Sequence, residues 1–238
     1  MTTQQYLWAD RYFWIAVVLC LAIQFYPNTR WILWPLRQFG TYVHELFHGL
    51  SALISGGAFN KMQLFSNNGG VAYTVSYGPF SSSLISAGGL LGPSILGGVM
   101  LFFSRRFFMS HYLLMALGTM IIASAIFWVR DWYTAGFCIM TGLILGATWF
   151  VKSKTVVRIF AQFLGVQLCL ENLLDFRYMF TQSFQRGGET LYSDTANIAK
   201  HFGGNYILWG TVIAALTLLI ITFSLIKSRP QFEGPKSK

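Results

Sequence analysis

Seven apolar segments dominate this chain and restrict it to folds that a membrane can hold. A helix needs about 20 mainly apolar residues to cross the hydrocarbon core of a bilayer. The candidate segments are residues 11–26, 31–54, 83–103, 112–129, 132–151, 156–176 and 206–226. We therefore expect an all-α integral membrane protein, a polytopic helical bundle of about seven transmembrane helices.

The composition agrees with a membrane location. Hydrophobic residues make up 54% of the chain and charged residues 11%, whereas soluble domains carry about 25% charged residues. The formal charge is +9, but the basic residues fall mainly between and after the apolar segments, where they serve as topology anchors and lipid contacts. This pattern predicts a bilayer partner and no nucleic acid. Basic residues lie in alternate loops and in the tail 227–238, and by the positive-inside rule this distribution predicts a cytoplasmic C-terminus.

We expect one polytopic membrane domain over residues 1–238, with two segments that are not spans. Residues 60–77 place strand-forming residues on both sides of Asn67-Asn-Gly-Gly, which predicts a small β-hairpin after the second helix. Residues 181–204 form a long polar connection with a short helix expected near 193–200.

The candidate chemistry lies in the second apolar segment, where residues 44–48 read His-Glu-Leu-Phe-His, an HExxH motif. On a helix, His44 and His48 are one turn apart and face the same way. Two such imidazoles can bind one zinc ion, and Glu45 can act as general base on a zinc-bound water. Ionisable residues are unfavourable inside a membrane, so their presence there indicates function.

A catalytic zinc site needs a third protein ligand. Outside the motif, Glu171 and Asp175 are the acids that lie within a predicted span. The predicted second and sixth helices run parallel, so Asp175, near the end of the sixth, reaches the same membrane half as the two histidines. We favour Asp175, with Glu171 and then Asp194 as alternatives. Structural roles for both span acids stay open: an ion pair of Asp175 with Arg177, and a helix contact for Glu171.

Asn172 lies one turn before Asp175 and is a candidate for a substrate or metal-orienting contact. A hydrogen bond between helices is an equally good interpretation of an asparagine at this position.

These motifs resemble the site-2 protease family of intramembrane zinc metallopeptidases, and within it a small bacterial M-fifty-B-like branch without a PDZ domain. The similarity rests on the HExxH motif with the small residues after it, Gly70-Val-Ala-Tyr-Thr in the hairpin, and Ala87-Gly-Gly-Leu-Leu-Gly-Pro93. Leu174-Asp175 stands where that family has a Leu-Asp-Gly metal ligand, although Phe176 replaces the glycine. Residues 171–175 also resemble the Glu-x-x-x-Asp element of another membrane zinc-protease group, in which the glutamate binds the metal.

The resemblance implies zinc bound by His44, His48 and Asp175, with Glu45 as the catalytic base. It implies intramembrane proteolysis, the cleavage of a peptide bond within or next to a transmembrane segment, by a multi-pass protein of the bacterial inner membrane. The expected partners are a membrane-protein or peptide substrate and a client-selecting protein. The alternative functions are an inactive protease-like protein that binds clients, and a transporter.

Overall fold

The computed structural model describes residues 17–18, 21–22, 34–104, 107–174, 176–186 and 189–227. The predicted first span, residues 11–26, lies almost entirely outside these ranges, as does the basic tail after Lys227. The described residues of each of the other six predicted apolar segments are helical over nearly all of their length. The largely helical fold and the small hairpin are therefore confirmed, and the count of seven spans stays a prediction.

The motif helix α2 (Trp34–Ile54) packs closely against α3 (Gly78–Phe103). Small residues make this approach possible: a β-carbon on Gly88 would lie 1.9 Å from Oγ of Ser51, and one on Gly92 would lie 2.3 Å from the Phe47 ring. Glycine at such positions lets two helix backbones come together. The glycine-rich start of α3 thus fixes the position of the helix that carries the motif.

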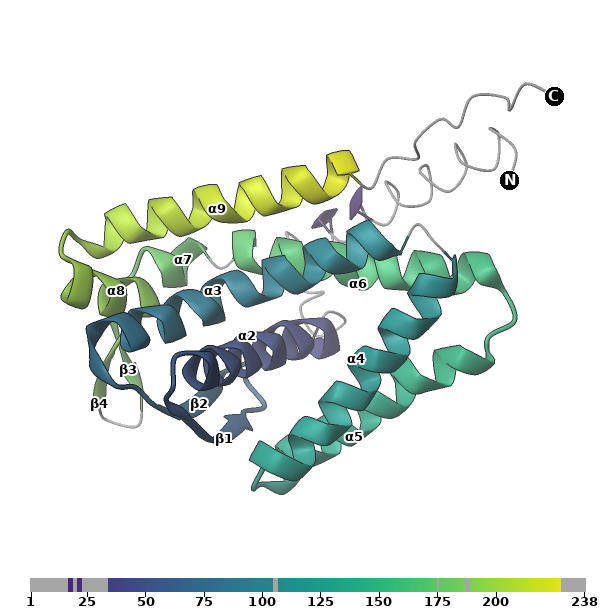
Figure 1. Cartoon of the computed structure of the whole chain (residues 1–238), viewed down its shortest axis with the longest axis horizontal. Helices are drawn as coiled ribbons and strands as arrows, with labels where there is room; N and C mark the ends of the chain where they lie inside the picture. The colour runs from purple at the N-terminus through teal and green to yellow at the C-terminus, as the bar shows by residue number, and fades with distance from the viewer. Residues whose placement is uncertain are drawn as a thin grey trace.

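Four further long helices of the described residues complete the bundle around this pair. The helix α6 (Lys154–Leu174) crosses α3 where a β-carbon on Gly97 would lie 2.6 Å from the Gly165 carbonyl oxygen. The helix α9 (Tyr206–Lys227) lies along α3, and the pair α4 (Phe107–Trp128) and α5 (Trp132–Ala147, continued by the turn η2, Thr148–Phe150) leaves the bundle at an angle (Figure 1).

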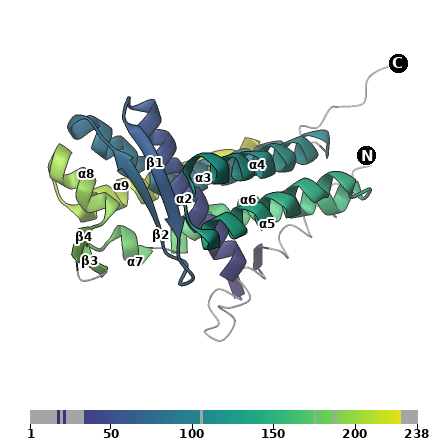
Figure 2. The same ribbon diagram turned by 90° about the horizontal axis from the view of Figure 1, so that it is seen from below.

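The predicted hairpin follows α2 and consists of β1 (Ala58–Leu64) paired antiparallel with β2 (Gly70–Val75). It lies along α2, as the view from below shows (Figure 2). The backbone N–H of Leu64 donates to Oγ1 of Thr134 at 2.8 Å. Asp131 caps α5 by accepting hydrogen bonds from both the N–H and the hydroxyl of Thr134. These bonds attach the hairpin to the start of α5.

The polar connection contains more structure than its sequence predicts. It holds a second hairpin of β3 (Ser183–Arg186) and β4 (Glu189–Tyr192), followed by α8 (Asp194–Phe202), and the short helix α7 (Phe176–Met179) comes just before this connection. The α8 helix falls where the short helix is predicted, and its N-cap Ser193 accepts the Ala196 N–H at 3.2 Å. Together these elements close one end of the bundle (Figure 1).

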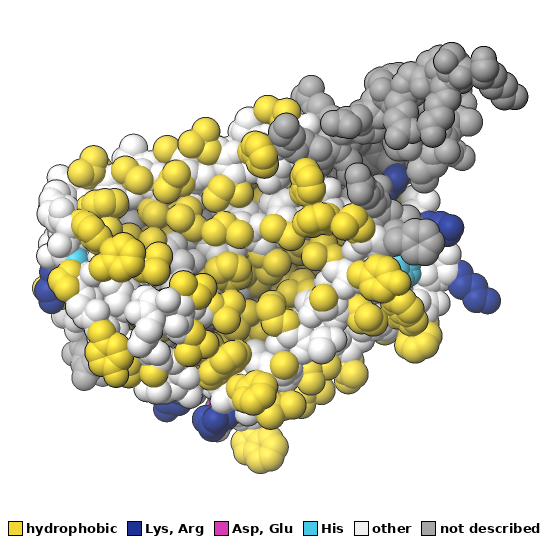
Figure 3. Space-filling model, in the orientation of Figure 1, with side chains coloured by type: hydrophobic (Ala, Val, Ile, Leu, Met, Phe, Trp, Pro, Cys, Tyr) yellow, Lys and Arg dark blue, Asp and Glu magenta, His cyan; other side chains and the backbone are white. Residues whose placement is uncertain are grey.

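Four described helices are long and apolar enough to cross a membrane: α3, most of α4, α5 with η2, and α9. Apolar side chains cover most of the face shown in Figure 3, and the few visible Lys and Arg side chains lie at its edges. Such a surface suits lipid rather than water. These features fit a membrane protein with four candidate spans, in which α2 and α6 are more polar helices.

Candidate metal centre

The motif histidines face each other on one side of α2. The two rings meet edge to face, with centroids 4.5 Å apart, and their Nε2 atoms lie 2.9 Å apart. This is the arrangement that the spacing of four residues predicts, because residues one turn apart share a helix face.

The orientation of His48 is fixed by α3. Its Nδ1 lies 2.8 Å from the carbonyl oxygen of Ile85. A carbonyl can only accept, so Nδ1 donates, and in the neutral imidazole that binds a metal the lone pair is then on Nε2. On the same helix, a β-carbon on Gly89 would lie 2.2 Å from the imidazole ring. The absence of a side chain at Gly89 therefore makes room for the ring.

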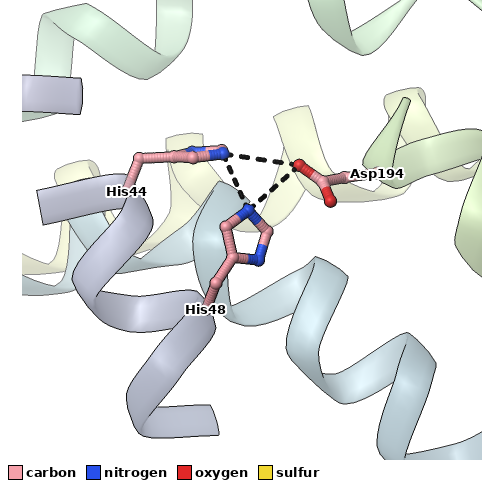
Figure 4. Close-up of side chains that lie close together, drawn as sticks. All are labelled: His44, His48 and Asp194. Carbon is pink, nitrogen blue, oxygen red and sulfur yellow. Dashed lines mark hydrogen bonds and ion pairs between the residues drawn. The ribbon is translucent and has the colours of Figure 1, made fainter. Parts of the chain in front are cut away.

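Asp194 supplies the third group from the first turn of α8. Its Oδ2 lies 3.4 Å from Nε2 of His44 and 3.4 Å from Nε2 of His48 (Figure 4). Among the described residues, the ligand atoms of these three side chains lie close enough together to hold one metal ion. The same Oδ2 accepts a hydrogen bond of 2.9 Å from the hydroxyl of Tyr178.

Burial alone would raise the pKa of Asp194, but the charge of His48 and the hydrogen bonds from both imidazoles lower the pKa below its ordinary value. The carboxylate is therefore in the charged form that a metal ligand requires. Burial raises the pKa of Tyr178, with the neighbouring Asp194 acting in the same direction. Its hydroxyl thus keeps the proton that it donates to Asp194.

These distances fit a zinc ion. Tetrahedral ligands at bond lengths of about 2.0–2.1 Å are separated from one another by about 3.3 Å. Both distances from Asp194 to the imidazoles, 3.4 Å, match that separation. The distance between the histidines, 2.9 Å, needs to widen by a few tenths of an ångström. Two imidazoles and a carboxylate are also a donor set of catalytic zinc sites.

Glu45 lies beside this group and is 6% exposed. The first residue of β2 presses against it, because a β-carbon on Gly70 would lie 2.7 Å from Oε1 of Glu45. Two cavities of about 350 and about 400 Å³ adjoin the site, and both are lined by His44, Glu45, Gly70 and Tyr178. The second cavity also reaches His48 and Asp194. Glu45 therefore borders the space that substrate and water would enter.

The other acids predicted for the site have different positions. Asp175, the favoured ligand, lies outside the described residues, as do the side chain of Asn172 and its contacts. Glu171 accepts a hydrogen bond of 3.1 Å from Gln167, packs against Gly40, and lines the smaller cavity. The roles of Glu171 as a helix contact and as an alternative ligand both stay predictions. The structure places Asp194, the third candidate, with the histidines.

Sequence reasoning missed three features of the site: the hydroxyl of Tyr178, the close approach of Gly70 to Glu45, and the support of His48 by Ile85 and Gly89. The glycines carry a weak signal, since both belong to motifs of small residues. Tyr178 carries none, because a tyrosine near the end of a membrane helix is typical of the membrane interface.

The HExxH helix, the converging carboxylate and the apolar bundle fit a membrane protein of the metallopeptidase class. A family profile for Peptidase M50B-like proteins matches residues 14–224. The chain belongs to this family, and with it to the site-2 proteases. Comparisons with curated proteins and with solved structures find no match.

Proposed function

We propose that this protein is a membrane-embedded zinc metalloprotease. His44, His48 and Asp194 would hold the zinc ion, and Glu45 would be the general base. The observation that carries the proposal is the meeting of three ligand atoms, all 2.9–3.4 Å apart, beside a buried glutamate. When bound, zinc supplies Lewis-acid activation of water and of the scissile carbonyl.

The protein's own residues provide the proton transfers and the orientation. Glu45 takes a proton from the attacking water and later delivers it to the leaving amine, as a positioned carboxylate does in general acid–base catalysis. Its neighbour Gly70 limits where the carboxylate can lie. The carbonyl of Ile85 keeps the His48 ring in one orientation and one tautomer.

The substrate would lie in an extended form along β2. Within the described residues, β2 pairs with β1 on one edge only, and its residues Val71, Ala72 and Thr74 line the larger cavity. An extended segment can add to such an edge through main-chain hydrogen bonds. A transmembrane helix hides its backbone, so the cleaved bond would belong to an unwound part within or next to a span.

The proposal includes the location of the protein in the cell. The protein would lie in a bacterial inner membrane with its C-terminus in the cytoplasm, and a partner protein would select clients. A wild-type protein that neither binds zinc nor cleaves a substrate would instead favour the alternatives, which are an inactive client-binding protein and a transporter.

The decisive experiment measures zinc content and the cleavage of a panel of transmembrane-segment fusions. The wild type is compared with Glu45→Gln, which removes the base but no proposed ligand, and with His44→Ala, which removes a ligand. We expect zinc in the wild type and in Glu45→Gln, and cleavage in the wild type alone. A wild type that binds no zinc would contradict the proposal, and cleavage by Glu45→Gln would contradict the role of Glu45.

A further inference from the structure

Tyr178 makes a contact that the motif chemistry does not require. Its hydroxyl donates to Oδ2 of Asp194 at 2.9 Å. That oxygen is the one that lies 3.4 Å from each imidazole Nε2. The hydrogen bond thus falls on the atom that the metal centre would use, and it determines the direction in which the carboxylate points.

A second hydrogen bond, between the residues that follow Tyr178 and Asp194, holds the two segments together. The hydroxyl of Thr195, which follows Asp194, donates at 2.8 Å to the carbonyl of Met179, which follows Tyr178. Both Thr195 and Met179 are buried, with exposed fractions of 0% and 1%. Two adjacent hydrogen bonds therefore connect α7 to the start of α8, and neither helix can slide without breaking both.

The ring of Tyr178 is also held in place. It meets the His44 ring edge to face, with ring centroids 6.2 Å apart. Its centroid lies 5.8 Å from that of the Phe184 ring in β3. The phenol is thus enclosed between a motif histidine and the second hairpin. A side chain held this firmly can orient its partner, as the groups around metal ligands do.

We propose that Tyr178 is a positioning residue for the metal centre, which fixes the carboxylate of Asp194 toward the two imidazoles. This inference rests on the proposed function and extends it to the region of α7. The hydroxyl would act on the metal centre through Asp194, to which it is hydrogen-bonded, and not on the reacting atoms. Removing it should weaken metal binding, because Asp194 would then have to be ordered by the ion itself.

The test compares the zinc affinity of purified wild type, Tyr178→Phe and Tyr42→Phe by competition with a chelator. Tyr42 is the control: it is buried and, like Tyr178, hydrogen-bonded through its hydroxyl, at 2.7 Å to Ser124, but on the side of α2 that faces α4. We expect zinc affinity to fall by about 10–100-fold in Tyr178→Phe and to stay unchanged in Tyr42→Phe. Equal affinity in wild type and Tyr178→Phe would overturn the inference.

A double-mutant cycle separates action through Asp194 from a direct effect. In an Asp194→Ala background, Tyr178→Phe should cause no further loss of zinc affinity. A full additional loss would overturn the inference, as would normal zinc affinity with a reduced kcat, which would indicate direct contact with the reacting atoms. A wild type that binds no zinc would overturn the proposed function as well, so the two failures are distinguishable.

Discussion

Gly70 and Glu45 approach each other so closely that no side chain fits between them. A β-carbon on Gly70 would lie 2.6 Å from Cγ and 2.7 Å from Oε1 of Glu45, and 2.8 Å from Cγ2 of Thr41. The hairpin therefore reaches the proposed catalytic base at a position where only glycine can stand, and the location of the glutamate depends on the location of β2.

Gly70→Ala should lower kcat while zinc stays bound. To restore an ordinary contact, Glu45 or β2 must shift by about 0.7 Å, and displacements near 1 Å can reduce rates about 100-fold. Gly136→Ala is the control, since a β-carbon there meets nothing within 4 Å. Zinc content and cleavage rate are measured for both variants. An unchanged kcat in Gly70→Ala would show that the contact does not position Glu45.

Gly89→Ala should have the opposite signature and lose the metal. Its β-carbon would lie 2.2 Å from Cε1 and Nε2 of His48, and His48 is held from the same helix by its bond to Ile85. The ring must therefore turn away from His44 and Asp194. We expect zinc affinity to fall by more than about 10-fold, the lower range for disturbed metal-ligand orientation. Full zinc retention would contradict this account of the site.

Asp194→Ala should reduce zinc affinity by more than about 100-fold, beyond the range for groups that only orient a ligand. Asp131→Ala is the matched control, since that aspartate caps α5 through Thr134. Asp175→Ala tests the ligand that the sequence favours. Retention of zinc in Asp194→Ala with loss in Asp175→Ala would move the third ligand to Asp175.

Thr134→Val should destabilise the junction between the first hairpin and α5. The N–H of Leu64 donates to the Thr134 hydroxyl, and Leu64 is 1% exposed. A buried N–H left without an acceptor reduces the free energy of unfolding by about 1–3 kcal/mol. Thermal unfolding in detergent should show a lower Tm for Thr134→Val. Thr134→Ser, which keeps the hydroxyl, should unfold near the wild-type temperature, and equal values for Val and Ser would contradict this role.

The helices and the first hairpin could be predicted because their signals are local. Apolar length marks α3, α4, α5 and α9, and the Asn-Gly turn between strand formers marks β1 and β2. The mean hydropathy of α2 and α6 is lower because they contain polar residues. These side chains face the protein interior: Gln38, Glu45 and Gln167 are 0%, 6% and 2% exposed. A criterion of high mean hydropathy therefore does not select these two helices as membrane spans.

The third acid of the site could not be found in this way. Asp194 stands in a polar connection, where an aspartate after a serine predicts only the start of a helix. Its position beside His44 depends on how α7, the second hairpin and α8 fold back over α2, and no local pattern encodes that path. The preference for an acid within a span excludes such a residue, although the connection brings Asp194 within 3.4 Å of both histidines.

The distance along the chain between the histidines and Asp194 affects the order in which the site is made. His44 and His48 leave the ribosome long before α8 is synthesised, so an unfinished chain holds two of the three proposed ligands. Tyr178 and the second hairpin are also made late. A growing polypeptide therefore lacks the proposed centre until α8 has been synthesised.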